Sequence, residues 1–397
     1  MPTHRALLGV ATVICAGALI AAGAAPATAE LPLMPASSGD DLYTAPADLD
    51  AHAPGDVLKV RTRPAPFAVF AGATQIQFRS TDSQQRPIAA VATVFTPANA
   101  QPNAPVLVWD HSVNSLGLRC APSQAMWSAD PDVTMRETPA LNAVLALGWS
   151  VIVPDHLGPT SAYGAARMGG QITLDAARAA TRHAPLQMGS SRFAIAGYSG
   201  GAMSAAYAAV LADSYAPELP IVGAAIGGLP ANIETMANAL WTNRHPAFGI
   251  AAAVAFGLSR EYPETLPVND YLNPAGEVFR SQMNDACINE ILRLGFGRSV
   301  NDFASSVDLF FAPSTRDVMH DNSIQFFDGA PRMPVFEWHS PTDALIPLAE
   351  LDATMNNWRA RGTSVTQVPV PTPDHLSAAV IGLPLAVQWL GGLFAQA

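Results

Sequence analysis

Lysine is almost absent from this 397-residue chain: of its 21 basic residues, only Lys59 is a lysine. The formal net charge is −11, and the arginines are not clustered along the sequence. Because binding to a phosphate backbone needs clustered Lys and Arg side chains, the sequence argues against a nucleic-acid partner. The acidic balance favours solubility instead.

Cysteine is also scarce. The chain has three cysteines, and Cys15 lies in an N-terminal segment that we expect to be removed. Two cysteines cannot form a cysteine-rich zinc site, and the chain lacks His-Glu-x-x-His, phosphate-loop and dinucleotide motifs. The sequence therefore implies no metal and no cofactor. An even pair in an exported protein predicts a disulfide between Cys120 and Cys287.

The N-terminus has the pattern of a secretory signal. A basic start at residues 4–5 is followed by an apolar segment at 6–22 and by the small-residue site Ala27-Thr28-Ala29. The apolar segment is too short to span a bilayer, which needs roughly 20 apolar residues. We predict cleavage after Ala29, so that residues 1–29 are a signal peptide. The mature chain is then secreted and has no transmembrane segment.

Strands alternate with helices along the mature chain. Residues 30–56 have no apolar period and predict an irregular lead-in, and residues 57–96 predict antiparallel strands at one sheet edge. Later strands are expected at residues 105–109, 150–153, 193–196, 221–226, 333–338 and 364–370, with helices at 140–147, 172–182 and 202–214. The alternation predicts an α/β fold with a mostly parallel sheet and helices on both faces. In such sheets the chemistry lies beyond the carboxyl ends of the strands.

About 100 residues separate two of these strands, which is too long for an ordinary connection. The interval contains its own helical stretches, including residues 248–258 and 275–294. We therefore divide the α/β core into residues 57–230 and 331–397, with a helical insertion at 231–330 that forms a cap. An interfacial role for the apolar stretch 247–258 is the alternative to a helix in the core of the cap.

The sequence Gly197-Tyr198-Ser199-Gly200-Gly201 lies between an expected strand and an expected helix. A glycine turn with an incidental serine would give the same five residues. The strand–helix context instead favours a nucleophile elbow, in which a strained turn presents the serine and only small residues fit on either side.

A serine hydroxyl needs a base to take its proton and an acid to orient that base. His375 and Asp343 each follow an expected strand, so both should lie on the side of the sheet where Ser199 lies. The order Ser, Asp, His along the chain is that of α/β hydrolases. Since His111, His156 and His339 also end strands, the residues alone favour His375 without excluding these three.

Two positions near the proposed triad have alternative roles. Asp374 is a second candidate acid, although its place before the last helix favours a helix cap. The oxyanion formed after attack needs two donors, and one is expected at the backbone N–H of Gly200. The second should come from the loop after an earlier strand, at Asp110 or, failing that, at His111. A loop cap is an equal interpretation of Asp110.

These motifs resemble the secretory lipase family of fungi and actinobacteria. The similarity covers roughly residues 57–395, and the run Ser214-Tyr215-Ala216-Pro217-Glu218-Leu219 is its most specific part. The matching segments are residues 120–123, 155–156, 197–202, 213–224, 227–228, 338–339, 343, 347 and 375–376. Asp110 departs from the family because it precedes Cys120 by a longer interval. The insertion matches poorly, which leaves substrate preference open.

The resemblance implies an α/β hydrolase with a helical cap that acts on carboxylic esters of lipids. It implies a triad of Ser199, Asp343 and His375, an oxyanion site at Asp110 and Gly200, and pairing of the two mature cysteines.

We therefore expect a secreted serine ester hydrolase, a lipase or carboxylesterase for triacylglycerols or other lipid esters, working through an acyl-enzyme. One alternative is an acyltransferase with the same triad. Another is a non-catalytic binding protein on the same fold, which would lack one of the triad residues. A serine peptidase is a third and weaker alternative. Acyl-chain length, alcohol, oligomeric state and transient contact with a lipid interface stay open.

Overall fold

The computed structural model describes the chain except for residues 2–32, 66–70, 134–137 and 397, so the predicted signal peptide lies outside the described residues. In the described part, nine strands form one sheet in the order β1-β2-β3-β5-β4-β6-β7-β8-β9. The strands are β1 (Val57–Pro64), β2 (Ala71–Thr81), β3 (Pro87–Pro97), β4 (Val106–Asp110), β5 (Ser150–Pro154), β6 (Phe193–Tyr198), β7 (Ile221–Gly227), β8 (Val335–His339) and β9 (Val365–Pro369).

The sheet is antiparallel at one edge and parallel elsewhere. β1, β2 and β3 pair in antiparallel fashion, and β3 pairs antiparallel to β5. The pairs from β5 through β9 are all parallel. The expected mostly parallel sheet with an antiparallel edge is confirmed. The carboxyl ends of β4, β6, β7, β8 and β9 therefore meet at one edge of the sheet.

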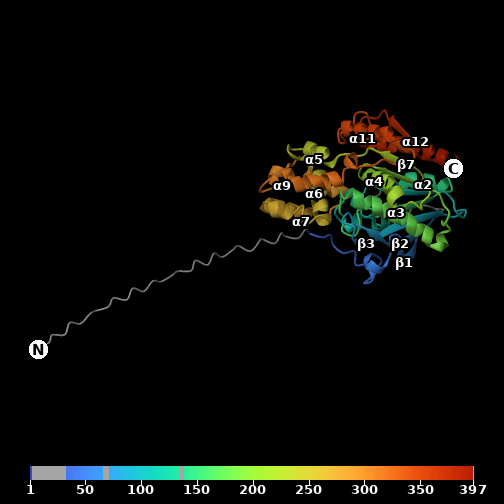
Figure 1. Ribbon diagram of the computed structural model, residues 1–397, viewed down its shortest axis with the longest axis horizontal. Helices are drawn as coiled ribbons and strands as arrows, with labels where there is room; N and C mark the ends of the chain where they lie inside the picture. Colours follow the sequence, from blue (N-terminus) through green and yellow to red (C-terminus); the bar gives the residue numbers. More distant parts are fainter. Residues whose placement is uncertain (2–32, 66–70, 134–137, 397) are drawn as a thin grey trace.

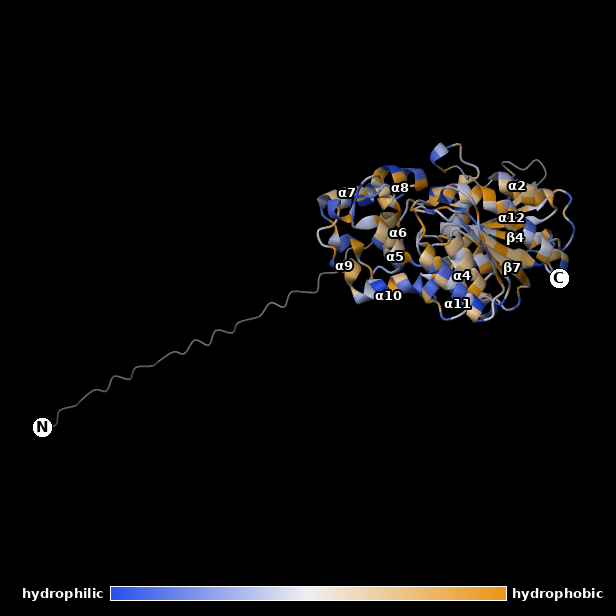
Figure 2. Cartoon of the chain, turned by 90° about the horizontal axis from the view of Figure 1, so that it is seen from above, coloured by the Kyte–Doolittle hydropathy of each residue, from blue (hydrophilic) through white to orange (hydrophobic). Residues whose placement is uncertain are grey.

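Helices cover both faces of the sheet (Figures 1 and 2). One face carries α2 (Thr138–Ala146) and α12 (His375–Gln396), and the other carries α3 (Ala166–Arg182), α4 (Gly200–Tyr215) and α11 (Leu348–Ala360); the short α1 (Pro122–Ala125) follows β4. In β4, Val106 and Val108 pack in the cluster of the second face, while Leu107 and Trp109 pack in that of the first. This alternation is the two-residue period of a strand buried on both sides.

The chain between β7 and β8 forms the helical insertion, which lies at the end of the molecule away from the C-terminus (Figure 1). Its helices are α5 (Ile233–Trp241), α6 (Phe248–Glu261), α7 (Pro274–Met283), α8 (Ile288–Gly295), α9 (Asp308–Phe311) and α10 (Pro313–Asp321). It has its own apolar core, which includes Phe248, Phe279 and Met283.

The expectation of one helical stretch over residues 275–294 was wrong, because the structure has two helices there. α7 ends at Met283, and α8 begins after Cys287, whose backbone N–H donates to Glu290 Oε2 at 2.8 Å. That hydrogen bond satisfies a free donor at the new N-terminus, as in a capping box. Local hydrophobic periodicity continues through the break and therefore does not reveal it.

The insertion is held to the core by a disulfide and by a buried arginine. Cys120 and Cys287 are joined, with their Cα atoms 5.6 Å apart, so the segment after β4 is tied to α8. Closing so long a loop stabilises the fold by roughly 2–4 kcal/mol. Arg260 of α6 donates to the carbonyls of Leu116, Thr160 and Asn284, and burial lowers the pKa of its guanidinium to about 10.

Candidate active site

Ser199 lies in a sharp turn between β6 and α4, with φ 55° and ψ −122°. This backbone conformation is rare for a residue with a side chain and persists only where the surroundings enforce it. A Cβ on Gly197 would lie 2.6 Å from the carbonyl oxygen of Gly201, and a Cβ on Gly201 would collide with the carbonyl of Asp110. The turn thus has the geometry of a nucleophile elbow.

His375 and Asp343 are placed in line with the serine. His375, the first residue of α12, has its Nε2 2.8 Å from Ser199 Oγ and its Nδ1 2.6 Å from Asp343 Oδ2. Asp343 lies in the loop between β8 and α11, and His375 follows β9. Three segments that are far apart in the sequence therefore meet at the carboxyl edge of the sheet.

The carboxylate of Asp343 is itself held in place. Its Oδ1 accepts hydrogen bonds from the backbone N–H groups of Leu345 and Ile346, at 2.9 and 3.0 Å. Burial alone would raise the pKa of Asp343, but the hydrogen bond to His375, the charge of that ring and the two backbone donors together lower the pKa below its usual range. The carboxylate is therefore ionised at neutral pH and can orient the imidazole.

The second residue of the elbow supports the histidine. The hydroxyl of Tyr198 donates to the backbone carbonyl of His375, and the two rings lie 5.0 Å apart. The residue before the nucleophile thus fixes the loop that carries the proposed base.

The other candidates from the sequence have different partners. His156 is bound by Ser204 Oγ and by the carbonyl of His111, each at 2.8 Å, and burial lowers its pKa to about 4. His339 Nδ1 lies 2.8 Å from Glu337. Asp374 accepts from the backbone N–H and the hydroxyl of Ser377, which is a helix cap. Of the candidate residues, His375 is the one whose side chain is hydrogen-bonded to Ser199.

The side chain of Asp110 is directed into the interior. Its Oδ1 lies 2.8 Å from Thr173 Oγ1 on α3, it has no exposed area, and burial raises its pKa well above the usual range. The hydroxyl of Thr173 donates to Asp110 Oδ1 and also lies 2.8 Å from the carbonyl of Gly169. The carboxyl is engaged in the core and has no hydrogen bond to Ser199. The hydrogen bond of its side chain is to a helix side chain and not to the loop that follows β4.

The sequence reasoning missed Asn114, in the loop after β4. A Cβ on Gly200 would collide with Asn114 Oδ1, so this side chain rests directly against the residue that follows Ser199. Asn114 is buried with φ 36°, and its Oδ1 has no hydrogen-bond partner among the described residues. Asn114 falls within the long interval between Asp110 and Cys120 that the sequence shows.

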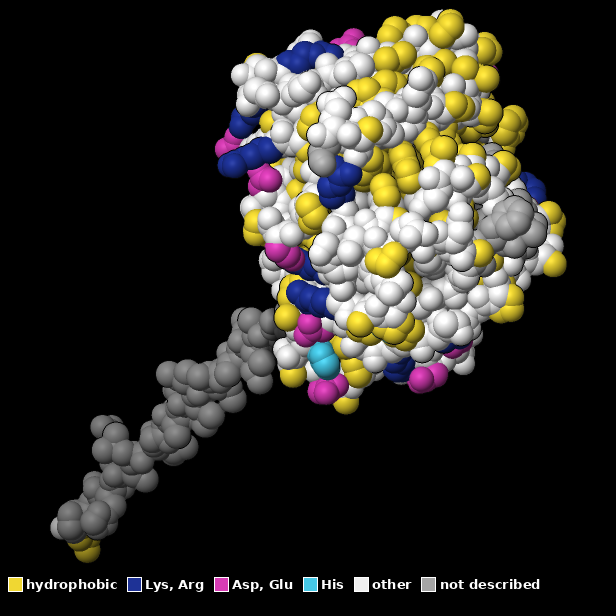
Figure 3. Space-filling model, turned by 90° about the vertical axis from the view of Figure 1, so that its right-hand side faces the viewer, with side chains coloured by type: hydrophobic (Ala, Val, Ile, Leu, Met, Phe, Trp, Pro, Cys, Tyr) yellow, Lys and Arg dark blue, Asp and Glu magenta, His cyan; other side chains and the backbone are white. Residues whose placement is uncertain are grey.

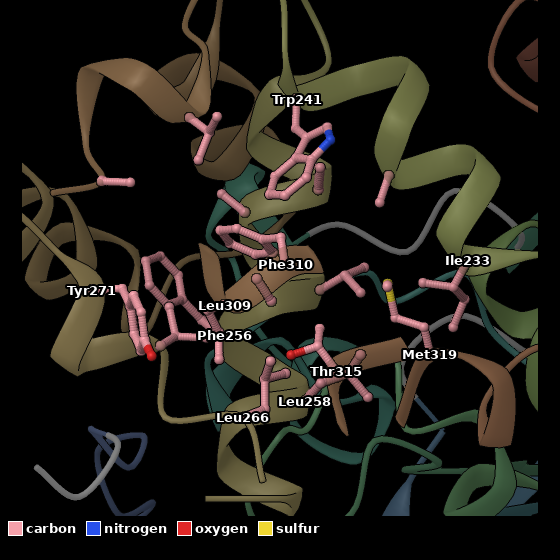
Figure 4. Close-up of a pocket in the computed structure, with 18 of the residues that line it drawn as sticks. Ile233, Trp241, Phe256, Leu258, Leu266, Tyr271, Leu309, Phe310, Thr315 and Met319 are labelled. Carbon is pink, nitrogen blue, oxygen red and sulfur yellow. The ribbon is translucent and has the colours of Figure 1, made fainter. Parts of the chain in front are cut away.

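A cavity of about 270 Å³ lies inside the helical insertion (Figure 4). Every residue that lines it falls between Ile233 and Met319, and the lining is dominated by aromatic and aliphatic side chains, among them Trp241, Phe256 and Phe310. Neither Ser199 nor His375 lines it. In the described part of the chain, no three His, Cys, Asp or Glu side chains converge as metal ligands.

The sheet, its flanking helices and the serine at the strand–helix turn define the class of protein as an α/β hydrolase. The model of the family "Secretory lipase" matches residues 128–397, and the chain belongs to that family. This makes it a carboxylic ester hydrolase by family.

Individual relatives agree with this assignment. The chain is 30% identical over 387 residues to Lipase 4 of Candida albicans, covering 92% of this chain and 83% of that protein. It is 30% identical over 376 residues to the Probable trichothecene esterase SAT6 of Stachybotrys chartarum, covering 89% and 76%. The crystal structure of Candida antarctica lipase A in its closed state superposes with a TM-score of 0.85 at 28% identity, covering 90% of this chain and 86% of that one.

Proposed function

We propose that this protein is a secreted serine esterase that cleaves carboxylic esters of lipids through an acyl-enzyme. Ser199 is the nucleophile, His375 the base and Asp343 the orienting acid. The observation that carries the proposal is the pair of hydrogen bonds that links the three side chains, at 2.8 and 2.6 Å. Residues 1–29 act as the export signal.

The reaction follows from this geometry. Ser199 Oγ attacks the ester carbonyl while His375 Nε2 takes its proton, and Asp343 stabilises the imidazolium that forms. The ester C–O bond then breaks, and His375 returns the proton to the leaving alcohol. Water, deprotonated by His375, attacks the acyl-enzyme, and the acid leaves as Ser199 regains its proton.

We propose that the oxyanion is stabilised by the backbone N–H of Gly200 and by the side-chain amide of Asn114, with Asp110 as the alternative second donor. Asn114 already lies against Gly200 with a polar atom that lacks a protein partner. Rotating the amide by half a turn exchanges its oxygen and nitrogen, so that Nδ2–H is presented where Oδ1 now lies. Two donors on neighbouring segments then face the same space.

Asn114→Ala is expected to lower kcat by roughly 100-fold with little change in KM, because the lost donor acts on the transition state. Asp110→Asn is the control, since it keeps the shape of the buried side chain and should leave kcat within a few-fold. The measurement is steady-state hydrolysis of p-nitrophenyl butyrate. A large loss in Asp110→Asn with none in Asn114→Ala would return the role to Asp110.

The cavity in the insertion holds the acyl chain. The segment Tyr163-Gly164 separates it from the elbow: a Cβ on Gly200 would lie 3.4 Å from the ring of Tyr163, and Gly164 packs against Val254 and Leu258, which line the cavity. An acyl chain bound to Ser199 reaches the cavity by passing Tyr163. Burial of each methylene contributes about 0.8 kcal/mol, so several carbons in the cavity change specificity by orders of magnitude.

Polar substitution of the cavity wall should weaken hydrolysis of long-chain esters selectively. Phe310 packs on Trp241 at a ring distance of 3.9 Å, and Phe311 lines the cavity while remaining largely exposed, so Phe311→Ser spares the core of the insertion. We expect Phe310→Ser and Phe311→Ser to lower kcat/KM for decanoate esters by at least roughly tenfold, with acetate hydrolysis retained. The measurement is a profile over p-nitrophenyl esters of graded chain length.

Phe296→Ser is the matched control, because Phe296 is an exposed phenylalanine of the insertion that does not line the cavity. The proposal that the acyl chain binds in the cavity would be contradicted by equal losses for short and long esters in both cavity variants. It would also be contradicted if the wild type hydrolysed esters of all chain lengths equally well.

A second candidate substrate is a short acyl group on a bulky alcohol, because the relative SAT6 is a probable trichothecene esterase. In that case the profile over p-nitrophenyl esters would have its maximum at acetate.

The acyltransferase alternative is tested by adding an alcohol to the assay. Formation of a new ester would indicate acyl transfer.

A further inference from the structure

Thr315 carries a buried hydroxyl on a helix face that is otherwise apolar. Helix α10 buries Thr315, Val318 and Met319, which are spaced three and four residues apart and therefore lie on one face. Thr315 is 1% exposed, and its Oγ1 has no hydrogen-bond partner among the described residues. Buried polar atoms in proteins nearly always have a partner, because burying one without a hydrogen bond costs free energy. A valine would fill the same space without that cost.

The hydroxyl is directed into the cavity of the insertion. Thr315 lines this cavity together with Leu258, Leu266 and Leu309. In Figure 4 its oxygen points between the side chains of Leu266 and Leu309. A water molecule held there would need several polar partners, and leucine side chains offer none. The hydroxyl is therefore left to be bonded by the molecule that occupies the cavity.

The other polar side chains of the lining are paired, less buried or limited to donation. Arg316 Nε lies 3.4 Å from Glu234 Oε1, Asn238 is exposed, and Tyr271 is only partly buried. Trp241 Nε1 is buried and also lacks a partner among the described residues. An indole N–H only donates, whereas a hydroxyl both donates and accepts. Thr315 thus gives an apolar stretch of wall one group with both capacities.

We propose that the cavity selects acyl chains that carry a hydroxyl group along the chain, and that Thr315 recognises this group. The inference rests on the proposed function and specifies its substrate as an ester of a hydroxylated fatty acid. A plain chain covers Thr315 Oγ1 and leaves it unbonded, whereas a hydroxylated chain supplies the missing hydrogen bond. A site built to bond a substrate hydroxyl discriminates strongly against the analogue that lacks it.

A neutral hydroxyl suits this place better than a second carboxylate. A carboxylate on the chain would be buried without a cation, because Arg316 of the lining is already paired with Glu234. Two hydroxyl groups, by contrast, satisfy each other, since each can donate to or accept from the other. The cavity therefore fits a hydroxylated chain and disfavours a dicarboxylic one.

The test is competition between methyl decanoate and the methyl esters of hydroxydecanoic acids that carry the hydroxyl near the ester, at mid-chain or at the chain end. Gas chromatography of the released acids gives the ratio of kcat/KM for each pair. The wild type should prefer one hydroxylated isomer. Thr315→Val should lower that preference by roughly tenfold, because the substrate hydroxyl loses its partner and the plain chain no longer covers an unbonded one. Thr315→Ser keeps the hydroxyl and should keep the preference.

Thr354→Val is the matched control. Thr354 is a buried threonine of α11 that does not line the cavity, and its hydroxyl donates to the carbonyl of Glu350 at 2.8 Å. This variant should show the wild-type ratio for every isomer. A thermal melt of each variant checks that the fold is kept.

Calorimetry with the Ser199→Ala protein measures the same preference without turnover. The favoured hydroxydecanoic acid should bind more tightly than decanoic acid, and the added Thr315→Val change should remove the difference. Figure 3 views the end of the molecule opposite the insertion, where hydrophobic side chains are also exposed. A fatty acid adsorbed on that surface would bind equally well with and without Thr315→Val.

The inference would be overturned if the wild type preferred no hydroxylated isomer, or if its preference survived in Thr315→Val. It would also be overturned if Thr354→Val lowered the preference as much as Thr315→Val did. A wild type that hydrolysed no ester, while calorimetry still showed a preference lost in Thr315→Val, would refute the proposed function and leave the recognition of the hydroxyl standing.

Discussion

Replacing Ser199 by alanine should lower kcat for ester hydrolysis by a factor on the order of a million, the loss expected when a triad nucleophile is removed. In the proposed mechanism this hydroxyl forms the bond to the acyl carbon, and it is the group that is hydrogen-bonded to His375 Nε2. The backbone at this position already tolerates a Cβ, so the fold and thermal stability should be unchanged. The measurement is turnover of p-nitrophenyl butyrate together with a thermal melt.

Ser214→Ala serves as the control, because Ser214 is an exposed serine near the end of α4, and its hydroxyl donates only to the carbonyl of Leu211. Its activity should equal that of the wild type. Residual turnover of Ser199→Ala within tenfold of the wild type would end the assignment of the nucleophile, and the acyl-enzyme mechanism with it.

Asp343→Asn should lower kcat by roughly 10⁴-fold, because an amide in this place favours the wrong tautomer of His375 and cannot stabilise the imidazolium. The two backbone N–H groups that now bind Asp343 Oδ1 can still bind the amide oxygen, so the side chain should keep its place. KM should change little. Steady-state kinetics and the thermal melt of the purified variant measure both expectations.

Asp374→Asn is the informative comparison, because Asp374 is the adjacent carboxylate that the sequence alone could not dismiss. It caps α12 through Ser377 and has no hydrogen bond to the ring of His375. We expect nearly full activity, with only a small loss in the free energy of unfolding. If Asp374→Asn lost more activity than Asp343→Asn, the two roles would have to be exchanged.

The sheet and the elbow could be predicted from the sequence because both depend on local patterns. A strand buried on both faces, such as β4, is a short continuous apolar run, and a strand-to-helix turn around a serine requires small residues on either side, as at Gly197 and Gly201. The position of Ser199, Asp343 and His375 at strand ends follows from the same patterns, since parallel strands end at one edge. These features need no knowledge of distant contacts.

The tertiary structure decided what depends on distant neighbours. His156, His339 and His375 all end strands, and only the partners that each ring meets, from segments far away in the chain, distinguish them. Asp110 ends β4, and Asn114 lies in the loop that follows. The contact with α3 places the side chain of Asp110 in the core, and the contact with Gly200 places that of Asn114 beside the elbow.

The same reason applies to the cavity and to the exposed residues of helix α12. Leu385 and Leu390 lie in one uninterrupted apolar helix, and hydropathy cannot tell that the first faces water while the second is buried against the sheet. Residues such as Phe310 are equally suited to a packed core or to a cavity wall. The sequence by itself determined the strands, the elbow and the order of the reactive residues, because these are set within a few residues of each other. Exposure, cavities and the choice among equivalent side chains were decided only by the tertiary structure, because they depend on which distant segments pack together.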